Sequence, residues 1–473
     1  MNNMQNMLWY GVFHLGSIVS VLLAIYLSSK ILRSPRMPSV TIGWLLVIIF
    51  VPLLGIPLYL TFGERKLTIR LNSKSKIKLH ETQGLHKTNH PIHSLLVSLG
   101  LPASSTDNQS TFHQDGKVAW EELKQLLKNA QYQIDIAMFI LANDHLGREV
   151  LSILSEKASK GVRVRLLLDG VGSFSLPKKH LKPLKDHGAQ VAWFIPVLHK
   201  PFKGRTNLRN HRKIIIADQH HVWAGGRNLS LDYLGPDCPD GCWVDLSFTQ
   251  SGDIAMNYLE VFEADWAFAN HKENALLTKQ KSTQIFKADT IKEKDKSEIQ
   301  IIPSGPDVQD DPIYSVMLTA FYNAKKHIMI STPYYVPDDN IQKALKLAAL
   351  RGVEVDLIIP AKSNHTLADI ARSRSLRELD YAGVSIWYLP TMVHAKALVI
   401  DSGFAMAGSA NLDIRSLFLN CELMGAFYSE KDVRWLSTWL ENLRESAALY
   451  QAPTIGTMDE IKEGLALLVA YQL

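Results

Sequence analysis

Cysteine is scarce in this chain, and charge of neither sign dominates. The 473 residues contain three cysteines, and 51 lysines and arginines stand against 46 aspartates and glutamates. Three irregularly spaced cysteines argue against a disulfide framework and favour a reducing compartment. Cys238 and Cys242 could form half of a metal site, but no second Cys or His pair at ligand spacing accompanies them. We therefore predict no metal site at these cysteines, and we expect no cofactor.

The most informative feature is a pattern of polar residues that occurs twice with identical internal spacing. In each copy a His-x-Lys is followed by an Asp, then by Gly-Gly or Gly-Ser, and then by an Asn. The two copies are His211, Lys213, Asp218, Gly225, Gly226 and Asn228, and His394, Lys396, Asp401, Gly408, Ser409 and Asn411. A single His in an apolar strand is more often a core residue, whereas two copies in matched register indicate a duplicated unit with a shared task.

The spacing predicts how these residues could converge. On a β-strand the His and Lys of each copy leave the same face, because they are two positions apart. If the two halves pack about a pseudo-twofold axis, they form one pocket that suits a phosphate diester. Lys213 and Lys396 would neutralise its charge, and the amides of Asn228 and Asn411 would bind its nonbridging oxygens. One histidine would attack phosphorus, and the other would act as acid and base.

A histidine in either role works best when a carboxylate holds its second ring nitrogen. Glu422, eleven residues past Asn411, and Asp245, seventeen residues past Asn228, are the candidates for this orienting role. Because the two spacings differ, the assignment is weaker for Asp245. A surface or salt-bridging role is the alternative for both carboxylates.

The paired motifs resemble those of the phospholipase D superfamily, which have the form His-x-Lys-x4-Asp-x6-Gly-(Gly/Ser)-x-Asn. Within this superfamily the chain is similar to bacterial cardiolipin synthases. The likeness includes WLLVIIFVPLLGIPLYLTFGE at 44–64, SGP at 304–306, STPYYVP at 331–337 and NLDIRSLFLNCE at 411–422. The resemblance implies a metal-free reaction in which one phosphatidylglycerol donates its phosphatidyl group to another and glycerol is released.

The resemblance also implies roles for single residues. His211 would be the nucleophile that forms a phosphohistidine, and His394 the acid and base, although the internal symmetry does not favour either order. Asp218 and Asp401 complete the predicted catalytic set, but the resemblance implies that they are mainly structural. Gly226 departs from the pattern, because Ser is often found at this position.

Other activities remain open at this point. The acceptor could be water or another alcohol, which would make the protein a phospholipase D-type hydrolase or transphosphatidylase. A diester nuclease is less compatible with the apolar N-terminal segments. A noncatalytic membrane scaffold is disfavoured, because neither motif has lost a residue.

Two apolar runs without Asp, Glu, Lys or Arg open the chain, Leu8–Ser29 and Val40–Phe62. As helices each would be about 33 Å long, which is enough to cross a bilayer core. We expect two transmembrane helices rather than a signal peptide, since Met1–Met7 lacks a basic stretch. Pro52 and Pro57 should kink the second run, and a re-entrant hairpin is the alternative to a full crossing.

Basic residues flank the second apolar run. Three lie before it and six after it, namely Lys30, Arg33 and Arg36, and Arg65, Lys66, Arg70, Lys74, Lys76 and Lys78. With two spans, the larger group favours a catalytic part in the cytoplasm. The resemblance to bacterial cardiolipin synthases implies that such a multi-pass protein lies in the bacterial cell (inner) membrane. The predicted partners are phosphatidylglycerol, anionic membrane lipids and the membrane itself. We expect no nucleic-acid partner, and the sequence does not define the oligomeric state.

Helical and strand patterns alternate in both halves. The expected helices are Val118–Ala130, Leu146–Lys160, Pro312–Lys326 and Asn340–Arg351, and the expected strands are Gln133–Leu141, Val162–Asp169, His327–Thr332 and Val353–Pro360. We predict an α/β fold of two tandem phospholipase D-type α/β/α halves related by pseudo-twofold symmetry, preceded by the two transmembrane helices.

The chain divides into six predicted parts. They are a membrane anchor (1–66), a basic linker (67–110), the first half (111–271), a charged linker (272–300), the second half (301–452) and a C-terminal amphipathic segment (453–473). The last segment would either pack on the body or rest on the membrane surface.

Overall fold

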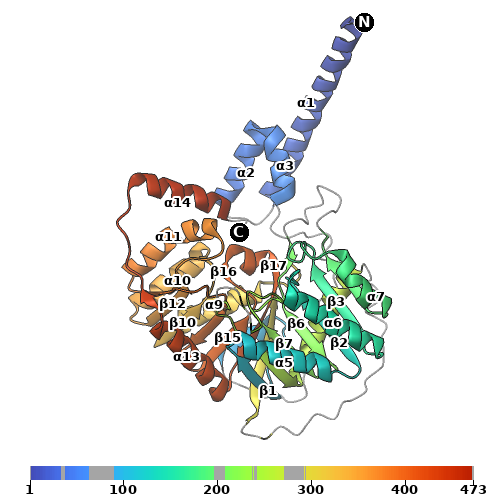
Figure 1. The fold of residues 1–473 in the computed structure, drawn as a ribbon. Helices are drawn as coiled ribbons and strands as arrows, with labels where there is room; N and C mark the ends of the chain where they lie inside the picture. The colour runs from blue at the N-terminus through green and yellow to red at the C-terminus, as the bar shows by residue number, and fades with distance from the viewer. Residues whose placement is uncertain are drawn as a thin grey trace. The chain divides into compact units, whose positions relative to one another are not determined.

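The computed structural model describes residues 2–33, 38–62, 90–196, 208–236, 238, 242–270, 292 and 295–470. The chain divides into two compact units. The described part of the first unit is apolar and helical, and the second unit contains the sheet and every later element (Figure 1). Each unit is described by itself.

Three helices make up the first unit: α1 (Asn2–Leu32), α2 (Pro38–Phe50) and α3 (Pro52–Phe62). Residues His14–Leu32 of α1 are long and apolar enough to cross a membrane. The second apolar run is interrupted between α2 and α3, because the ring and missing N–H of Pro52 break the helix. At Gly55 the chain passes so close to α2 that an added Cβ would lie 2.4 Å from the Val47 carbonyl oxygen.

The break changes the expected membrane anchor. Helices of 13 and 11 residues are about 20 and 17 Å long, which is too short for a bilayer core of about 30 Å. The described residues thus contain one helix of spanning length, and the prediction of two transmembrane helices is not confirmed. The pair of α2 and α3 has the form of the re-entrant alternative.

The second unit is built on one continuous sheet of sixteen strands. The first half contributes, in sheet order, β4 (Gln190–Phe194), β3 (Arg163–Asp169), β2 (Gln133–Met138), β6 (Ile214–Ala217), β7 (His221–Gly225), β8 (Ser247–Gly252) and β1 (Ser105–His113). The second half contributes β13 (Ser385–Leu389), β12 (Glu354–Pro360), β10 (His327–Ser331), β14 (Ala397–Ile400), β15 (Phe404–Gly408), β17 (Asn420–Phe427) and β9 (Ser297–Ser304).

The two halves of the sheet have the same strand order and direction pattern, and they meet where β1 pairs antiparallel with β9. Short strands add to this frame: β18 (Ala448–Leu449) extends the edge at β13, and β5 (Arg209–Asn210) pairs with β17. A separate pair joins β11 (Tyr335–Val336) to β16 (Leu412–Asp413). The α/β fold with two repeated halves is therefore confirmed.

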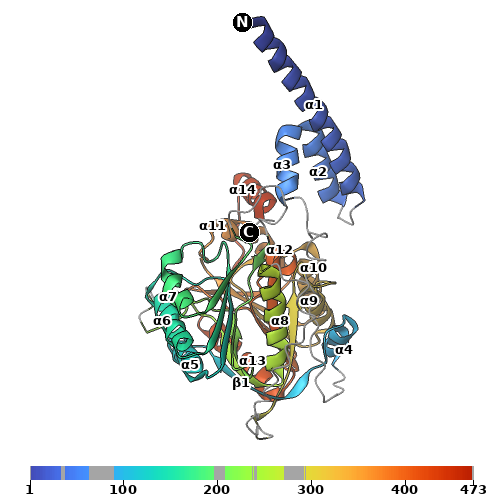
Figure 2. The same cartoon turned by 90° about the vertical axis from the view of Figure 1, so that its right-hand side faces the viewer.

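Helices cover both faces of the sheet. In the first half α5 (Gly116–Asn129), α6 (His145–Ser159) and α7 (Lys182–Asp186) lie on one face and α8 (Ile254–Ala269) on the other (Figure 2). The corresponding helices of the second half are α9 (Pro312–Asn323), α10 (Asp339–Leu350), α11 (Thr366–Tyr381) and α13 (Glu430–Glu445). Sequence explains the helix starts: Asp115, Asp144 and Asp338 accept N–H bonds from the first turns of α5, α6 and α10.

Two predicted linkers include folded structure. The segment 67–110 contains α4 (Pro91–Ser98), which packs into the second-half core, and most of β1; the segment 272–300 contains the start of β9. We interpreted the sequence of β1 as part of a linker because most of its residues are polar. Its buried polar side chains are hydrogen-bonded internally, as when Asn108 donates to the carbonyl oxygens of Ser105 and Ser297.

The C-terminal segment forms α14 (Thr457–Ala470), which packs on α11. Ala466 is buried against α11, and Arg377 forms a two-pronged ion pair with Glu463. The segment thus packs on the body, which was one of the two expected arrangements. Met458, Ile461 and Leu465 remain exposed on the outer face of the helix.

Candidate active site

Each motif histidine lies in an extended segment just before a strand, His211 before β6 and His394 before β14. These segments are not assigned as strands, in contrast to our expectation, because they leave the ladder of their own half. The His211 N–H donates to the Cys421 carbonyl of the second half (2.9 Å), and the His394 N–H donates to the Val244 carbonyl of the first half (2.7 Å). The main chain of each half therefore positions the histidine of the other half.

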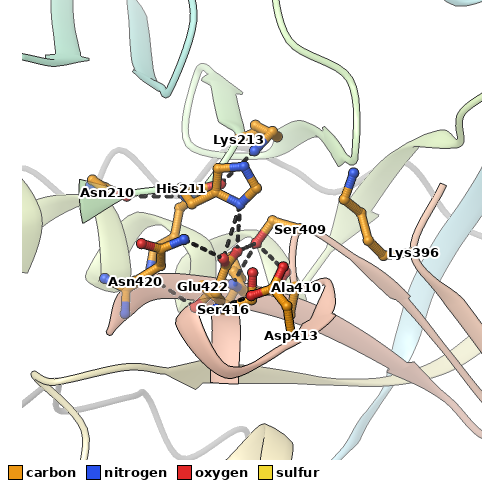
Figure 3. A network of polar contacts seen from close by, with 12 residues as sticks. Asn210, His211, Lys213, Lys396, Ser409, Ala410, Asp413, Ser416, Asn420 and Glu422 are labelled. Atoms are coloured by element: carbon orange, nitrogen blue, oxygen red, sulfur yellow. Dashed lines mark hydrogen bonds and ion pairs between the residues drawn. The ribbon is translucent and has the colours of Figure 1, made fainter. Parts of the chain in front are cut away.

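The carboxylates cross between the halves in the same way. Nδ1 of His211 lies 2.9 and 3.0 Å from the two carboxylate oxygens of Glu422 (Figure 3). Nδ1 of His394 lies 2.7 Å from Oδ2 of Asp245. The sequence left open which acid serves which histidine, and the structure pairs each acid with the histidine of the opposite half. A proton on Nδ1 leaves the lone pair of each imidazole on Nε2.

A serine hydroxyl holds the longer of the two acids. Ser409 Oγ donates to Oε2 of Glu422 (2.5 Å) and accepts the N–H of Leu423 (2.9 Å). The Asn420 amide donates to the other oxygen of Glu422 (3.3 Å). Figure 3 shows Ser409, Asn420 and His211 around this carboxylate.

Asp245, the shorter of the two acids, is held in place without a serine. Oδ1 of Asp245 itself accepts the N–H of Leu246 (2.7 Å), and a Cβ added to Gly226 would lie 2.2 Å from that oxygen. The side chain of Asp245 thus occupies the space that a Ser409-like side chain would fill. This geometry explains why glycine replaces serine in the first motif.

The unequal spacings of the acids come from an insertion. Gly226 N–H donates to the Leu246 carbonyl (2.9 Å) as Ser409 N–H donates to the Leu423 carbonyl (3.0 Å), so the preceding residues Asp245 and Glu422 are equivalent. The first half places Cys238 and Cys242 in the added loop, and the structure joins them in a disulfide. This local bond differs from the expectation of reduced cysteines.

Both motif lysines are almost fully buried, each 2% exposed. Nζ of Lys213 donates to the His211 carbonyl (2.7 Å), and Nζ of Lys396 lies 3.0 Å from Nε2 of His394. Burial, with repulsion from Lys396, lowers the pKa of Lys213 to about 7, and burial lowers the pKa of Lys396 to about 8. Near neutral pH Lys213 is therefore partly deprotonated and Lys396 is mostly protonated, and a bound anion would stabilise both ammonium groups.

The pKa values of both histidines and of Asp245 are lowered as well. Burial, opposed by Glu422, lowers the pKa of His211 to about 4; burial together with Lys396 lowers the pKa of His394 to about 3. Burial alone would raise the pKa of Asp245, but Lys396 and His394 outweigh it and lower that pKa to about 2. These pKa values correspond to neutral imidazoles beside ionised carboxylates at neutral pH, which suits a nucleophile. A bound phosphodiester anion would favour protonation of a histidine that must act as an acid.

The two motif asparagines are buried beside the histidine segments. Oδ1 of Asn228 accepts the N–H of Ile140 (3.2 Å), and its side chain also bonds to Tyr233. The Asn411 side chain bonds to Asp413, a residue whose pKa burial raises to about 6. The predicted clamp on phosphate oxygens requires these amides to turn toward a substrate, so their role stays a prediction.

The motif aspartates lie at the far ends of their strands. Asp218 accepts the N–H groups of Gln131, Tyr132 and Gln133 at 2.8 to 2.9 Å. Asp401 accepts those of Lys325, Lys326 and His327 at 2.7 to 2.9 Å. Both acids tie a hairpin turn to the start of a neighbouring strand, and these bonds reach no other motif residue. These contacts agree with the structural role that the resemblance implies for both aspartates, and their place in the catalytic set stays a prediction.

Aromatic rings around the histidines were not found from the sequence. Phe139 contacts the His211 ring edge to face (4.8 Å between centroids), and Tyr233 contacts His394 in the same way (4.9 Å). The ring centroids of Trp243 and His394 are 5.9 Å apart. These rings exclude water, which explains why burial dominates the pKa of each histidine. Their positions depend on tertiary packing, and no sequence signal marks them.

A buried arginine between His211 and Lys213 was also missed. Arg212 points away from them, to the other side of the segment, where it donates to Asp265 (2.7 Å), Asp307 (3.0 Å) and the Glu422 carbonyl (3.1 Å). Alternation of side chains along an extended segment is the signal that could have predicted this opposite orientation.

Among the described residues, one group offers three possible metal ligands within reach of one another: His327, Glu354 and Asp356. It lies at the amino ends of β10 and β12, away from the motif histidines. Arg444 forms ion pairs with both acids of this group (3.5 and 2.9 Å), which disfavours a second cation there.

The fold and the paired motifs define a phospholipase D-type protein whose two halves both contribute to one site. The family model described as "Cardiolipin synthase, PLD-like domain" matches residues 123–266 and 317–444, and that described as "Phospholipase_D-nuclease N-terminal" matches residues 18–64. The chain belongs to the cardiolipin synthase family of the phospholipase D superfamily, and it is an enzyme.

Curated relatives match over nearly the whole chain. Cardiolipin synthase 2 of Bacillus anthracis is 32% identical over 431 residues, which cover 88% of this chain and 83% of the relative. Cardiolipin synthase of Clostridium perfringens strain SM101 is 34% identical over 411 residues, which cover 84% and 85%. The solved phosphatidylserine synthase of Haemophilus influenzae Rd KW20 shares the fold, with a TM-score of 0.58 and 13% identity over 77% of this chain and 95% of that chain.

Proposed function

We propose that this enzyme is a cardiolipin synthase that transfers a phosphatidyl group from one phosphatidylglycerol to another and releases glycerol. The observation that carries the proposal is that each half supplies the carboxylate that binds the histidine of the other half. Two neutral histidines, each held at Nδ1 by a carboxylate of the other half, share the site with two buried lysines. This set supplies a nucleophile, an acid and base, and positive charge for a phosphodiester without a metal ion.

In the first step Nε2 of His211 attacks phosphorus, and the bond to the glycerol oxygen breaks. His394, which takes up a proton at Nε2 when the phosphodiester anion binds, gives this proton to the headgroup oxygen, and glycerol leaves. In the second step the free glycerol hydroxyl of another phosphatidylglycerol attacks the phosphorus of the phosphohistidine, the bond from phosphorus to Nε2 of His211 breaks, and Nε2 of His394 takes the hydroxyl proton. Lys213, Lys396, Asn228 and Asn411 would stabilise the charge on the nonbridging oxygens in both steps.

For the membrane arrangement we propose that α1 crosses the bilayer and that α2 and α3 enter and leave it on one side. Both ends of such a hairpin face the same compartment, so the basic residues before and after it share that side. This removes the competition between the two groups in the two-crossing topology. The positive charge then favours a cytoplasmic catalytic body at the cell (inner) membrane. Residues 1–66 would be the anchor of the six-part organisation given above.

The test is product analysis. Purified protein in detergent micelles is incubated with glycerol-labelled phosphatidylglycerol and a chelator, and the products are resolved by mass. We expect cardiolipin and free glycerol in equal amounts. Phosphatidic acid as the main product would show that water is the acceptor, and activity that requires an added divalent ion would refute the metal-free mechanism.

A further inference from the structure

An exposed apolar turn follows β3 beside the pocket. Val171 and Phe174 are 46% and 73% exposed, although both are hydrophobic. The turn begins directly after Asp169, the last residue of β3. Oδ2 of Asp169 accepts the N–H of Asn210, the residue before His211 (3.0 Å). The turn therefore lies at the end of the sheet where the pocket is.

Hydrogen bonds fix the turn in place. Oδ1 of Asp169 accepts the N–H groups of Val171 (2.9 Å) and Gly172 (3.0 Å). The buried Ser173 donates to the carbonyl of Phe139, whose ring contacts His211. Because the backbone on both sides of Phe174 is held, its exposed ring has a defined position relative to the active site.

Exposed lysines continue this surface along the chain. Helices η1 (Lys178–Leu181) and α7 (Lys182–Asp186) bury Leu181 and Leu184 and turn four lysines to the solvent. These are Lys178, Lys179, Lys182 and Lys185. Asp186 is the only acid within residues 171–186, and it pairs with Lys182 (2.6 Å). The segment thus combines two exposed apolar side chains with a net positive charge.

We propose that residues 171–185, the β3–α7 rim, dock the mouth of the active site on an anionic lipid bilayer. Phe174 and Val171 enter the interface, and the four lysines contact headgroups. The choice of a bilayer rests on the proposed function, which requires lipid headgroups to reach His211 and Lys213. Charge supports the same choice, because anionic lipids attract surface lysines. Two apolar side chains are also too few to form the core of a stable protein interface.

The experiment places a fluorophore at position 174 of the full-length protein. The Phe174→Cys variant, with Cys238 and Cys242 replaced by Ser in this protein and in its control, is labelled with an environment-sensitive dye; the remaining Cys421 is 1% exposed. Asn129→Cys is the matched control. It is exposed and lines the same groove as Asp218, at the far end of the first half. Both proteins are reconstituted into phosphatidylglycerol-containing vesicles and into pure phosphatidylcholine vesicles, with a spin-labelled lipid as quencher.

We expect a blue shift and lipid quenching at position 174 in the anionic vesicles only, and neither at position 129. Replacing the four rim lysines by Gln should lower the ratio of docked to undocked protein by about fivefold for each lysine. The same replacement of Lys117, Lys128, Lys160 and Lys343, which are exposed elsewhere, should leave the signal unchanged.

Absence of quenching at position 174 would overturn the proposal, as would quenching that ignores the rim lysines. A shift that grows with protein concentration in lipid-free detergent would assign the surface to a second copy and overturn it as well. Because the dye reports docking without turnover, these results stand apart from any failure to form cardiolipin.

Discussion

Gly226→Ala is the smallest change that should disable one histidine without touching it. The added Cβ would lie 2.2 Å from Oδ1 and 2.9 Å from Cγ of Asp245, far inside contact distance. Asp245 is fully buried and bonded to Leu246, so it cannot move aside at no cost. Either the Asp245 side chain must move away from His394, or the backbone at position 226 must move away from Asp245 and Leu246. His394 would then lose the carboxylate that fixes its tautomer and stabilises its charged form.

The magnitude follows from the role of His394. General acid–base catalysis contributes about 10² to 10⁴ to the rate, and we expect Gly226→Ala to lose a factor of about 10² or more in kcat. Ser409→Gly is the matched control in the second half. It removes one hydrogen bond to Glu422 without introducing a clash, and a bond to a charged group contributes about 1.5 to 3 kcal/mol, part of which water can replace. The control should lose less activity than Gly226→Ala.

A double variant separates the steric effect from misfolding. Gly226→Ser with Asp245→Glu would copy the serine and glutamate of the second half, and it should recover activity relative to Gly226→Ser alone. The assay is cardiolipin formation in micelles at saturating phosphatidylglycerol, with a thermal melt of each variant. Wild-type turnover in Gly226→Ala would refute the reasoning, since it would mean that Asp245 does not need its observed position.

Three further predictions concern the acids and the lysine. Glu422→Gln should lower kcat by about 10² with little change in lipid binding, because an amide cannot stabilise a charged His211; a fall in proportion to lost folded protein would contradict this role. Lys213 has a lowered pKa of about 7, so it loses its charge as pH rises and kcat/KM should fall above that pH. In Lys213→Arg, which stays charged, this fall should begin nearer the pKa of Lys396, about 8, and an unchanged profile would exclude Lys213 as its cause. Asp218→Ala should reduce the free energy of unfolding by about 2 kcal/mol in denaturant titrations and reduce turnover of folded protein far less than His211→Ala, because three backbone N–H groups lose their acceptor.

The sequence predicted the duplicated fold because its two halves repeat both the motifs and the alternation of helices and strands. Residues such as Leu123 and Leu127 on α5 carry a local helical period, and that signal does not depend on the rest of the chain. The polar strand β1 lacks a comparable signal. It forms because β8 and β9 supply partners on both sides, and those partners are far away in sequence.

The sequence predicted the residues of the site, but it did not predict which acid contacts which histidine. The motif spacing identifies His211, His394 and the two lysines, since these types recur in register. Which acid reaches which histidine depends on how segments from opposite halves cross, and no local pattern encodes this. The different spacing of Asp245 was misleading. The loop that contains Cys238 adds residues between Asn228 and Asp245, but the position of Asp245 beside Gly226 is the same as that of Glu422 beside Ser409.

The central claim is a covalent phosphatidyl group on His211, and adduct mapping tests it most directly. The His394→Ala variant is mixed with a phosphatidyl ester of nitrophenol, whose leaving group needs no general acid, and the protein is digested for peptide mass spectrometry. We expect one equivalent of nitrophenol in a burst and a phosphatidyl adduct on His211 that decays slowly, because no base activates the acceptor. An adduct mapped to residue 394 in the wild-type protein, or a folded variant that shows no burst, would contradict the account.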